Sequence, residues 1–225
     1  YPPTIARDHP DADAYVMAGS GESLTYGQLD AASNSLARLL ISRGIGAEEF
    51  VAVALPRGID WMVTLWAIVR TGAAWVPVDP EYPAARIEFM IADSGARLMI
   101  TDSAADPGVP GIETLILDAA ETGSALATSD DAALCPGELR TPPQVDHPAY
   151  LIYTSGTTGR PKGAELTVGN LLAAGEVAAQ VSRGTSDDRL GTGLPLFHVF
   201  GQASVMMAAF TSGASMSLLG RFTPR

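Results

Sequence analysis

Hydrophobic positions recur along the chain with two different patterns. In residues 26–44, Leu29, Ser33, Leu36 and Leu40 share one stripe and Gly44 follows as a stop signal, which predicts an amphipathic helix. Residues 50–55, FVAVAL, form a continuous apolar run of strand length. Runs of this kind are typical of strands that helices cover on both faces of a sheet. The chain therefore begins as a helix-and-strand alternation.

The alternation continues to the end of the chain. Further helices are predicted over residues 59–72, 83–95, 168–181 and 202–213, and further strands over 73–78, 96–101, 149–154, 189–195 and 214–220. Helices that alternate with buried strands favour the α/β class, doubly wound, with mainly parallel sheets flanked by helices.

Two stretches interrupt the pattern. Residues 103–111 and 119–148 are rich in Pro, Gly, Ala, Ser and Asp, and only the short run 112–117, IETLIL, lies between them. Long stretches without periodicity are usually surface excursions or linkers. We therefore expect a first α/β subdomain over residues 1–147 and the start of a second over 148–225, with a seam near 140–148.

Charge and cysteine content narrow the functional classes. The formal net charge of -11 and the isoelectric point near 4.6 disfavour a broad nucleic-acid or anionic-lipid surface, because phosphates would be repelled. Cys135 is the one cysteine, so no internal disulfide is possible, and we expect a reducing, cytoplasmic setting. No apolar run reaches the roughly 18 residues of a membrane span, and the first residues resemble no signal peptide. The acidic pairs 48–49 and 187–188 have no third ligand nearby in sequence, so no metal site is expected.

Residues 153–163, YTSGTTGRPKG, directly follow a predicted strand and carry the strongest chemical signal. Gly156 and Gly159 allow backbone amides to approach an anion, and Lys162 adds a point charge suited to phosphate oxygens. Pro161 stiffens this loop, and Gly163 is expected to relax its exit. Hydroxyl donors are added by Thr154, Ser155, Thr157 and Thr158. The loop is interpreted as a polyphosphate cradle.

Two other interpretations of the loop were weighed. A Walker A loop requires Ser or Thr after the lysine and four residues between its glycines, whereas Gly163 follows Lys162, so a P-loop NTPase is excluded. A polar surface turn would explain the glycines and threonines but not the proline and the lysine at these positions.

The loop resembles the signature phosphate loop of the adenylate-forming superfamily, which comprises acyl-CoA synthetases, luciferases and the adenylation domains of nonribosomal peptide synthetases. Residues 24–40 and 70–101 are similar to two earlier conserved blocks of that superfamily, and residues 194–201, LPLFHVFG, resemble the acyl-CoA synthetase form of the next block. The resemblance covers the whole chain and corresponds to the N-terminal portion of a longer enzyme. One departure is Val168, where the family usually has a histidine.

This resemblance implies a two-step reaction. A carboxylate attacks the α-phosphate of ATP to form an acyl-adenylate and pyrophosphate, and the thiol of coenzyme A or of a carrier's phosphopantetheine then displaces AMP. Lys162 and Mg²⁺ would neutralise the phosphates. His198 would lie near the reacting carboxylate and orient or gate it, although a histidine between phenylalanines is, without other information, more often a packing residue. The phosphate-binding residues carried over are Thr154, Ser155, Gly156, Thr157, Thr158, Gly159 and Lys162.

Three functions follow as hypotheses. Residues 194–201 favour an ATP-dependent acyl-CoA synthetase that acts on a fatty or dicarboxylic acid. Residues 70–101 lean towards an amino-acid-activating adenylation domain with a carrier-protein partner, although FHVFG offers no acidic residue for a substrate ammonium. The third hypothesis is a non-catalytic binding domain that kept the loop. The superfamily's later motifs are expected beyond Arg225, so this chain alone is expected to be an incomplete, inactive enzyme.

Overall fold

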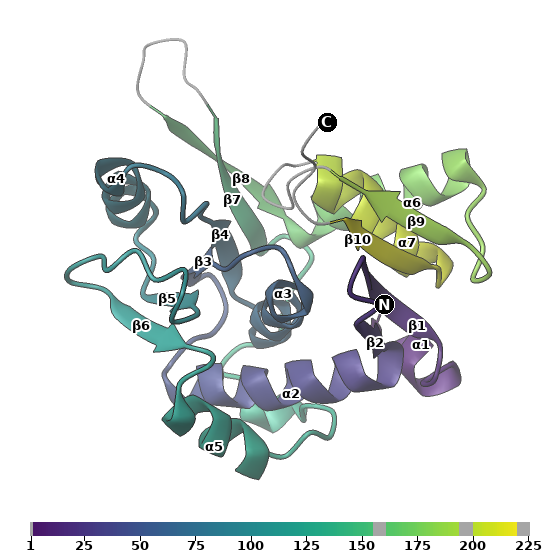
Figure 1. Cartoon of the computed structure of the whole chain (residues 1–225), viewed down its shortest axis with the longest axis horizontal. Coiled ribbons are helices and arrows are strands. Elements are labelled where there is room, and N and C mark those ends of the chain that lie inside the picture. Colours follow the sequence, from purple (N-terminus) through teal and green to yellow (C-terminus); the bar gives the residue numbers. More distant parts are fainter. Residues whose placement is uncertain (1, 155–160, 194–199, 220–225) are drawn as a thin grey trace. The chain divides into compact units, whose positions relative to one another are not determined.

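The computed structural model describes residues 2–154, 161–193 and 200–219, which form two compact units. The first unit draws on residues 1–32, 57–60 and 169–225, and the second on residues 33–56 and 61–168. The chain therefore passes from the first unit to the second and back more than once. Figure 1 shows the course of the chain and labels its elements.

The second unit is built on a six-stranded sheet. Its strand order is β6-β5-β3-β4-β7-β8, with parallel pairing throughout except for the antiparallel pair β7 and β8. Because β3 lies between β4 and β5, the chain first moves one way from β3 and then returns to its other side, which is the doubly wound arrangement. The strands are β3 (Phe50–Ala54), β4 (Ala74–Pro77), β5 (Leu98–Thr101), β6 (Glu113–Ile116), β7 (Pro148–Thr154) and β8 (Lys162–Thr167).

Helices cover both faces of this sheet, α4 on one side and α3 on the other (Figure 1). On the α4 side, Ile87 and Met90 pack against Ala52, Val76 and Met99 from the strands. Alternate strand residues point to opposite faces, and both faces of β3 and β4 are buried, which explains their continuous apolar sequence. The helices are α2 (Tyr26–Ser42), which begins in the first unit, α3 (Ile59–Thr71), whose first residues also belong to the first unit, α4 (Ala84–Ser94) and α5 (Ala120–Thr128), with a short 3₁₀ turn at Pro136–Glu138.

The first unit is built on a four-stranded sheet of order β2-β1-β10-β9. In its core, Phe210 meets the rings of Tyr15 and Tyr26 edge to face, and the Tyr26 hydroxyl donates to the Ala214 carbonyl at 2.7 Å. Its strands are β1 (Asp13–Ala18), β2 (Ser23–Thr25), β9 (Arg189–Thr192) and β10 (Ser215–Leu219). Its helices are α1 (Pro2–Asp8), α6 (Val168–Ser182) and α7 (Met207–Ser212), the last preceded by a π-helical stretch, Phe200–Met206.

The α/β class and the parallel strands predicted from the sequence are confirmed. The predicted stripe of α2 is buried at Leu29, Ser33, Leu36 and Leu40. Gly95 ends α4 in the left-handed conformation at φ 65°, as its stop position predicts. Four predicted strands after the first also lie at or within their expected ranges, but α1, β1, β2, β8 and α5 were not predicted. In the part of β8 after its first residues, and throughout α5, the exposed small and polar side chains provide no apolar period to detect.

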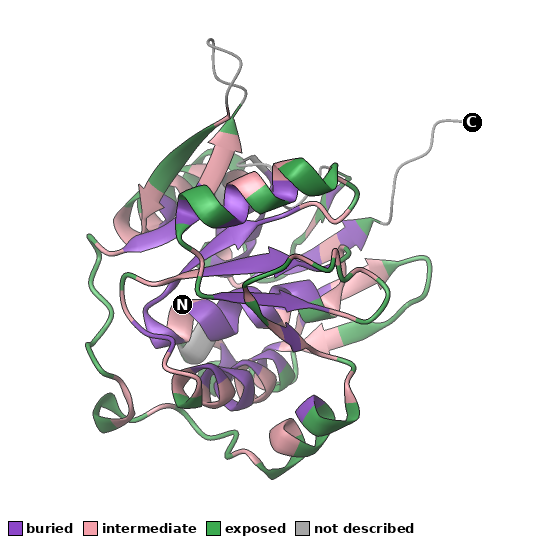
Figure 2. Ribbon diagram, turned by 90° about the vertical axis from the view of Figure 1, so that its left-hand side faces the viewer, coloured by how far each residue is buried: buried purple, intermediate pink, exposed green. Residues whose placement is uncertain are grey.

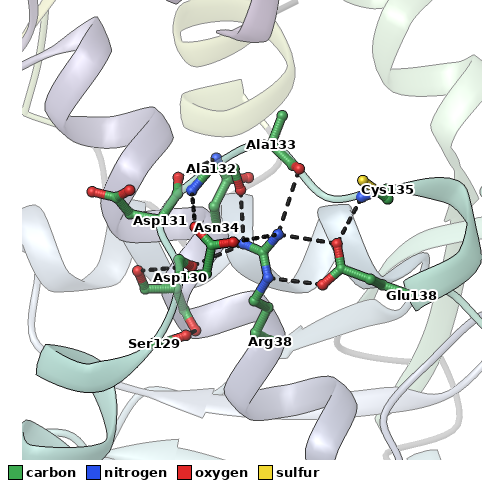
Figure 3. A network of polar contacts seen from close by, with 10 residues as sticks. Asn34, Arg38, Ser129, Asp130, Asp131, Ala132, Ala133, Cys135 and Glu138 are labelled. Carbon is green, nitrogen blue, oxygen red and sulfur yellow. Dashed lines mark hydrogen bonds and ion pairs between the residues drawn. The ribbon is translucent and has the colours of Figure 1, made fainter.

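The stretch interpreted as a surface excursion is held to α2 by Arg38 (Figure 3). Its guanidinium forms a bidentate ion pair with Glu138, at 2.8 and 3.0 Å, and also donates to the carbonyls of Asp130 and Ala132 at 2.8 and 2.7 Å. The backbone N–H of Cys135 donates to the same Glu138 carboxylate at 2.7 Å. The segment before β7 therefore follows a defined path along α2.

The predicted seam falls just before β7. Within this chain β7 pairs with β4, so the strand that leads into the predicted phosphate loop belongs to the same sheet as β3–β6. The division into subdomains 1–147 and 148–225 stays a prediction for the protein that contains this chain.

Candidate phosphate-loop site

The predicted phosphate loop begins at the carboxyl end of a strand in the parallel sheet. β7 runs parallel to β4, with Trp75 opposite Tyr150, and ends at Thr154. Loops at the carboxyl ends of parallel strands form the ligand-binding edge of open α/β sheets. The position expected from the sequence is therefore confirmed for the residue that begins the loop.

The chain returns from the loop as a strand rather than directly as a helix. β8 pairs antiparallel with β7 over six residue pairs, the last being Thr154 opposite Lys162. The Thr154 hydroxyl donates to the Lys162 carbonyl at 3.4 Å. The first and last predicted phosphate-binding residues are thus brought side by side, and they define the base of the loop.

Both residues at this base are exposed, whereas the start of β7 is buried (Figure 2). Among the described residues, no carboxylate pairs with the Lys162 ammonium. An exposed cation without such a partner has its charge available for an anion. The arrangement fits a group that carries phosphate oxygens.

Gly163 has a packing role at this site. A Cβ atom on Gly163 would lie 3.0 Å from Cδ1 and 3.3 Å from Cγ of Leu151. Gly163 lies within β8, and its φ is not in the left-handed region. The expectation that it relaxes the loop exit is therefore corrected: the missing side chain lets β8 lie close to Leu151.

The other predicted site residues lie outside the described residues. They are Ser155, Gly156, Thr157, Thr158 and Gly159 of the loop, and His198 of the proposed acid site. Their roles stay predictions.

In the first unit, Arg57 lies at the carboxyl ends of β9 and β10. One of its nitrogens, Nη1, donates to the carbonyls of Leu219 and Gly193, at 2.8 and 3.3 Å. Gly193 is the last described residue before the range that contains His198. Sequence reasoning assigned Arg57 no role, and its contacts span more than 130 positions, so no local signal indicates them.

A second residue missed by sequence reasoning is Tyr153, directly before Thr154. Its hydroxyl lies 2.8 Å from the Asp93 carboxylate on α4. A signal existed in the sequence, since the quoted loop motif begins with this tyrosine, but its partner is 60 positions away.

No metal cluster and no membrane span are found in the part of the chain that the structure describes. No three His, Cys, Asp or Glu side chains of the described residues lie where they could together bind a metal ion. None of the described helices is long and apolar enough to cross a membrane.

An open α/β sheet with a Gly-, Thr- and Lys-containing loop at its carboxyl edge is typical of proteins that bind nucleotide phosphates. Comparison with known proteins is more specific. The family described as AMP-binding enzyme matches residues 4–225, and the chain belongs to this family. Its fold is that of the N-terminal portion of adenylate-forming enzymes.

Individual relatives agree with this assignment. The chain is 38% identical over 223 residues to Novobiocin biosynthesis protein H of Streptomyces niveus, covering 96% of this chain and 36% of that protein. It is 41% identical over 147 residues to a dimodular nonribosomal peptide synthase of Bacillus subtilis, covering 64% of this chain and 6% of that protein. Among solved structures, ATP-bound MatB from Rhodopseudomonas palustris superposes with a TM-score of 0.83 at 27% identity, covering 98% of this chain and 45% of MatB. The chain thus spans well under half the length of these relatives.

Proposed function

We propose that the protein containing this chain activates a carboxylic acid with ATP, through an acyl-adenylate, and transfers the acyl group to a thiol. One observation carries the proposal: in a member of the AMP-binding enzyme family, Thr154 and Lys162 are paired at the base of the predicted phosphate loop. MatB, a relative of the same fold, has been solved with ATP bound, which supports ATP as the nucleotide.

In this proposal the loop binds the phosphates that leave as pyrophosphate. Lys162 supplies positive charge, and the Thr154 hydroxyl and the loop's other hydroxyls and amides supply hydrogen-bond donors. Such groups accelerate a phosphoryl or nucleotidyl transfer by orienting it and by neutralising the developing charge. When bound, Mg²⁺ would offset charge on the phosphate oxygens. No metal cluster occurs among the described residues, so we propose no protein ligand for it.

His198 is proposed to orient the acid. Its neighbours in LPLFHVFG are apolar, which suits an acyl pocket, and the imidazole can donate a hydrogen bond to a carboxylate. Replacing it by alanine is expected to raise the KM for the acid while the KM for ATP changes little.

The class of acid divides the proposal into two candidates. The chain's higher identity to the Bacillus subtilis peptide synthase favours an amino-acid-activating adenylation domain that serves a carrier protein. The likeness of LPLFHVFG to acyl-CoA synthetases, together with the MatB fold, favours a fatty or dicarboxylic acid and coenzyme A. We place the adenylation domain first because 41% and 38% identity exceed 27%.

Exchange of labelled pyrophosphate into ATP tests adenylation directly. The natural protein that contains this chain would be assayed with a panel of amino, fatty, dicarboxylic and aromatic acids. Exchange that depends on one acid supports the proposal and identifies the acid class. Exchange with none of them contradicts it and favours the non-catalytic hypothesis.

The acceptor thiol is decided by a second assay. Coenzyme A and a phosphopantetheine-loaded carrier protein would be supplied in turn with the acid identified above, and thioester formation measured. Thioester formation on the carrier alone supports the adenylation domain, and formation on coenzyme A alone reverses our order.

A further inference from the structure

Tyr153 precedes the phosphate loop by a single residue and is bound to α4 through its hydroxyl. The hydroxyl oxygen lies 2.8 Å from Oδ2 of Asp93 and 3.2 Å from the carbonyl oxygen of Met90. A hydroxyl has one proton to donate, and the shorter contact, to a charged acceptor, is the stronger. Tyr153 therefore donates chiefly to Asp93.

The ring of Tyr153 is bound to the same helix. It packs against the core cluster that contains Ile87 and Met90 of α4, and it meets Phe89 edge to face with ring centroids 6.1 Å apart and planes at 72°. Both ends of this side chain, apolar and polar, thus contact α4.

The position of this contact gives it importance. Among the described residues, β7 shares one residue pair with β4, Trp75 with Tyr150, but six pairs with β8. After Tyr150 the β7–β8 hairpin therefore extends away from the sheet, as its arms do in Figure 1. Tyr153 lies in this extension and connects it back to α4.

Tyr153 is also next to the predicted phosphate-binding residues. It pairs with Gly163 across the hairpin, and the adjacent pair is Thr154 with Lys162. A displacement of Tyr153 would be passed to the neighbouring pair, because consecutive pairs of an antiparallel ladder share one backbone.

Asp93 is poorly explained by the helix alone. It lies in the last turn of α4, where the helix dipole disfavours a carboxylate. Burial and then the hydrogen bond and charge of Asp93 raise the pKa of the Tyr153 hydroxyl, which remains a proton donor at neutral pH. The pair therefore has a stable polarity, with tyrosine donating and aspartate accepting.

We propose that Tyr153 is a positioning residue: by binding Asp93 and packing on α4, it fixes the Thr154–Lys162 end of the hairpin and hence the place where the ATP phosphates bind. The inference rests on the proposed function in one respect, that this end of the hairpin binds ATP. The contact of Tyr153 with α4 can be tested without it.

The test compares two tyrosines of one strand in the natural protein that contains this chain. Tyr153→Phe keeps the ring and removes the hydroxyl. Tyr150→Phe is the matched control, because the described residues provide no hydrogen-bond partner for the Tyr150 hydroxyl. Pyrophosphate exchange gives the KM for ATP and for the acid, and hydrogen exchange measured by mass spectrometry gives the protection of the β8 amides.

We expect Tyr153→Phe to raise the KM for ATP roughly three- to tenfold, with less than about a twofold change in the KM for the acid, because phosphate-binding groups are misplaced and the acid site is not. The β8 amides should exchange faster, since the hairpin loses its connection to α4. Tyr150→Phe should change neither quantity.

A second variant tests the partner. Asp93→Ala should reproduce part of the effect of Tyr153→Phe, since Met90 still offers an acceptor. In the double variant Asp93→Ala should add little, because both substitutions remove the same hydrogen bond. Additive effects would mean that the two side chains act separately and would overturn the inference.

Equal changes in both KM values, or β8 exchange that is the same in Tyr153→Phe and Tyr150→Phe, would also overturn it. If the unaltered protein exchanges pyrophosphate with no acid, the proposed function fails. The β8 hydrogen exchange then decides by itself whether Tyr153 positions the hairpin.

Discussion

Trp75 and Tyr150 form both the recorded backbone pair between β4 and β7 and a stacked pair of rings, with centroids 5.2 Å apart and planes at 11°. Both side chains are fully buried. The strand that leads into the predicted phosphate loop is thus connected to the rest of the sheet where two large aromatic side chains meet. Burial raises the pKa of the Tyr150 hydroxyl to about 12.

Truncation of Trp75 is expected to destabilise the fold. Trp75→Ala removes the stacked partner of Tyr150 and leaves a cavity in the core, which should lower the free energy of unfolding by about 3–5 kcal/mol. Urea unfolding measures the change. Val181→Ala, at a side chain that is 81% exposed on α6, is the control and should stay within about 0.5 kcal/mol. Equal effects of both substitutions would contradict the central role of the stacked pair.

Gly175 is expected to tolerate no side chain. A Cβ atom there would lie 2.7 Å from Cβ and 3.1 Å from the carbonyl oxygen of Met207, so α6 and α7 would have to separate. Gly175→Ala should lower the free energy of unfolding by about 1–3 kcal/mol, although alanine favours helices.

The matched control is Gly123→Ala in α5, where a Cβ atom would meet nothing within 4 Å. There the higher helix propensity of alanine should raise the free energy of unfolding by about 0.5–1 kcal/mol. Thermal unfolding of both variants gives the two signs, and the same sign for both would refute this account of Gly175.

Lys162 is expected to matter for activity and not for stability. Its side chain is exposed and has no carboxylate partner among the described residues. Lys162→Gln should reduce pyrophosphate exchange by roughly a hundredfold or more, because a charge that faces the phosphates is lost. The free energy of unfolding should change by less than about 0.5 kcal/mol. Lys162→Arg, which keeps the charge, should retain more activity than Lys162→Gln, and the reverse order would argue against an electrostatic role.

The Arg38–Glu138 contact predicts a pH dependence. The backbone N–H of Cys135 and then the Arg38 guanidinium lower the pKa of the Glu138 carboxyl in the folded state. Such a carboxylate adds stability above its unfolded pKa, and this contribution is lost as the pH falls through the lowered folded pKa. Glu138→Gln should therefore be less stable than the unaltered protein at neutral pH, and the difference should shrink in acid.

Unfolding midpoints of the two proteins, measured from neutral pH to below the ordinary pKa of a glutamate, check this sign. Glu81→Gln, at a side chain exposed to solvent for which no ion pair is recorded, serves as the reference. A difference that grows as the pH falls would show that Glu138 does not act as a paired carboxylate.

The sequence predicted those elements whose burial follows a local period. Leu29, Leu36 and Leu40 are four to seven positions apart, so the stripe that buries α2 is visible without any knowledge of the fold. β8 could not be found in this way. Its residues are largely exposed, and its backbone bonds to β7 decide that it is a strand.

The site divides in the same manner. The residue types of the loop, and hence the expectation of a phosphate site, come from neighbours in the chain, and the position of the loop at the carboxyl edge of a parallel strand followed from the alternation of elements. The pairing of Tyr153 with Asp93, the clasp of Arg38 on Glu138 and the contacts of Arg57 join residues that are 60, 100 and 136 or more positions apart.

The sequence by itself thus determined the α/β class, most of the buried helices and strands and the chemistry of the phosphate loop, because each depends on side chains that are close along the chain. Only the tertiary structure decided that the loop closes a hairpin, that Thr154 faces Lys162 and that α4 binds the strand beside them. These relationships depend on strand order and on the distance between remote side chains, which packing of the whole sheet sets.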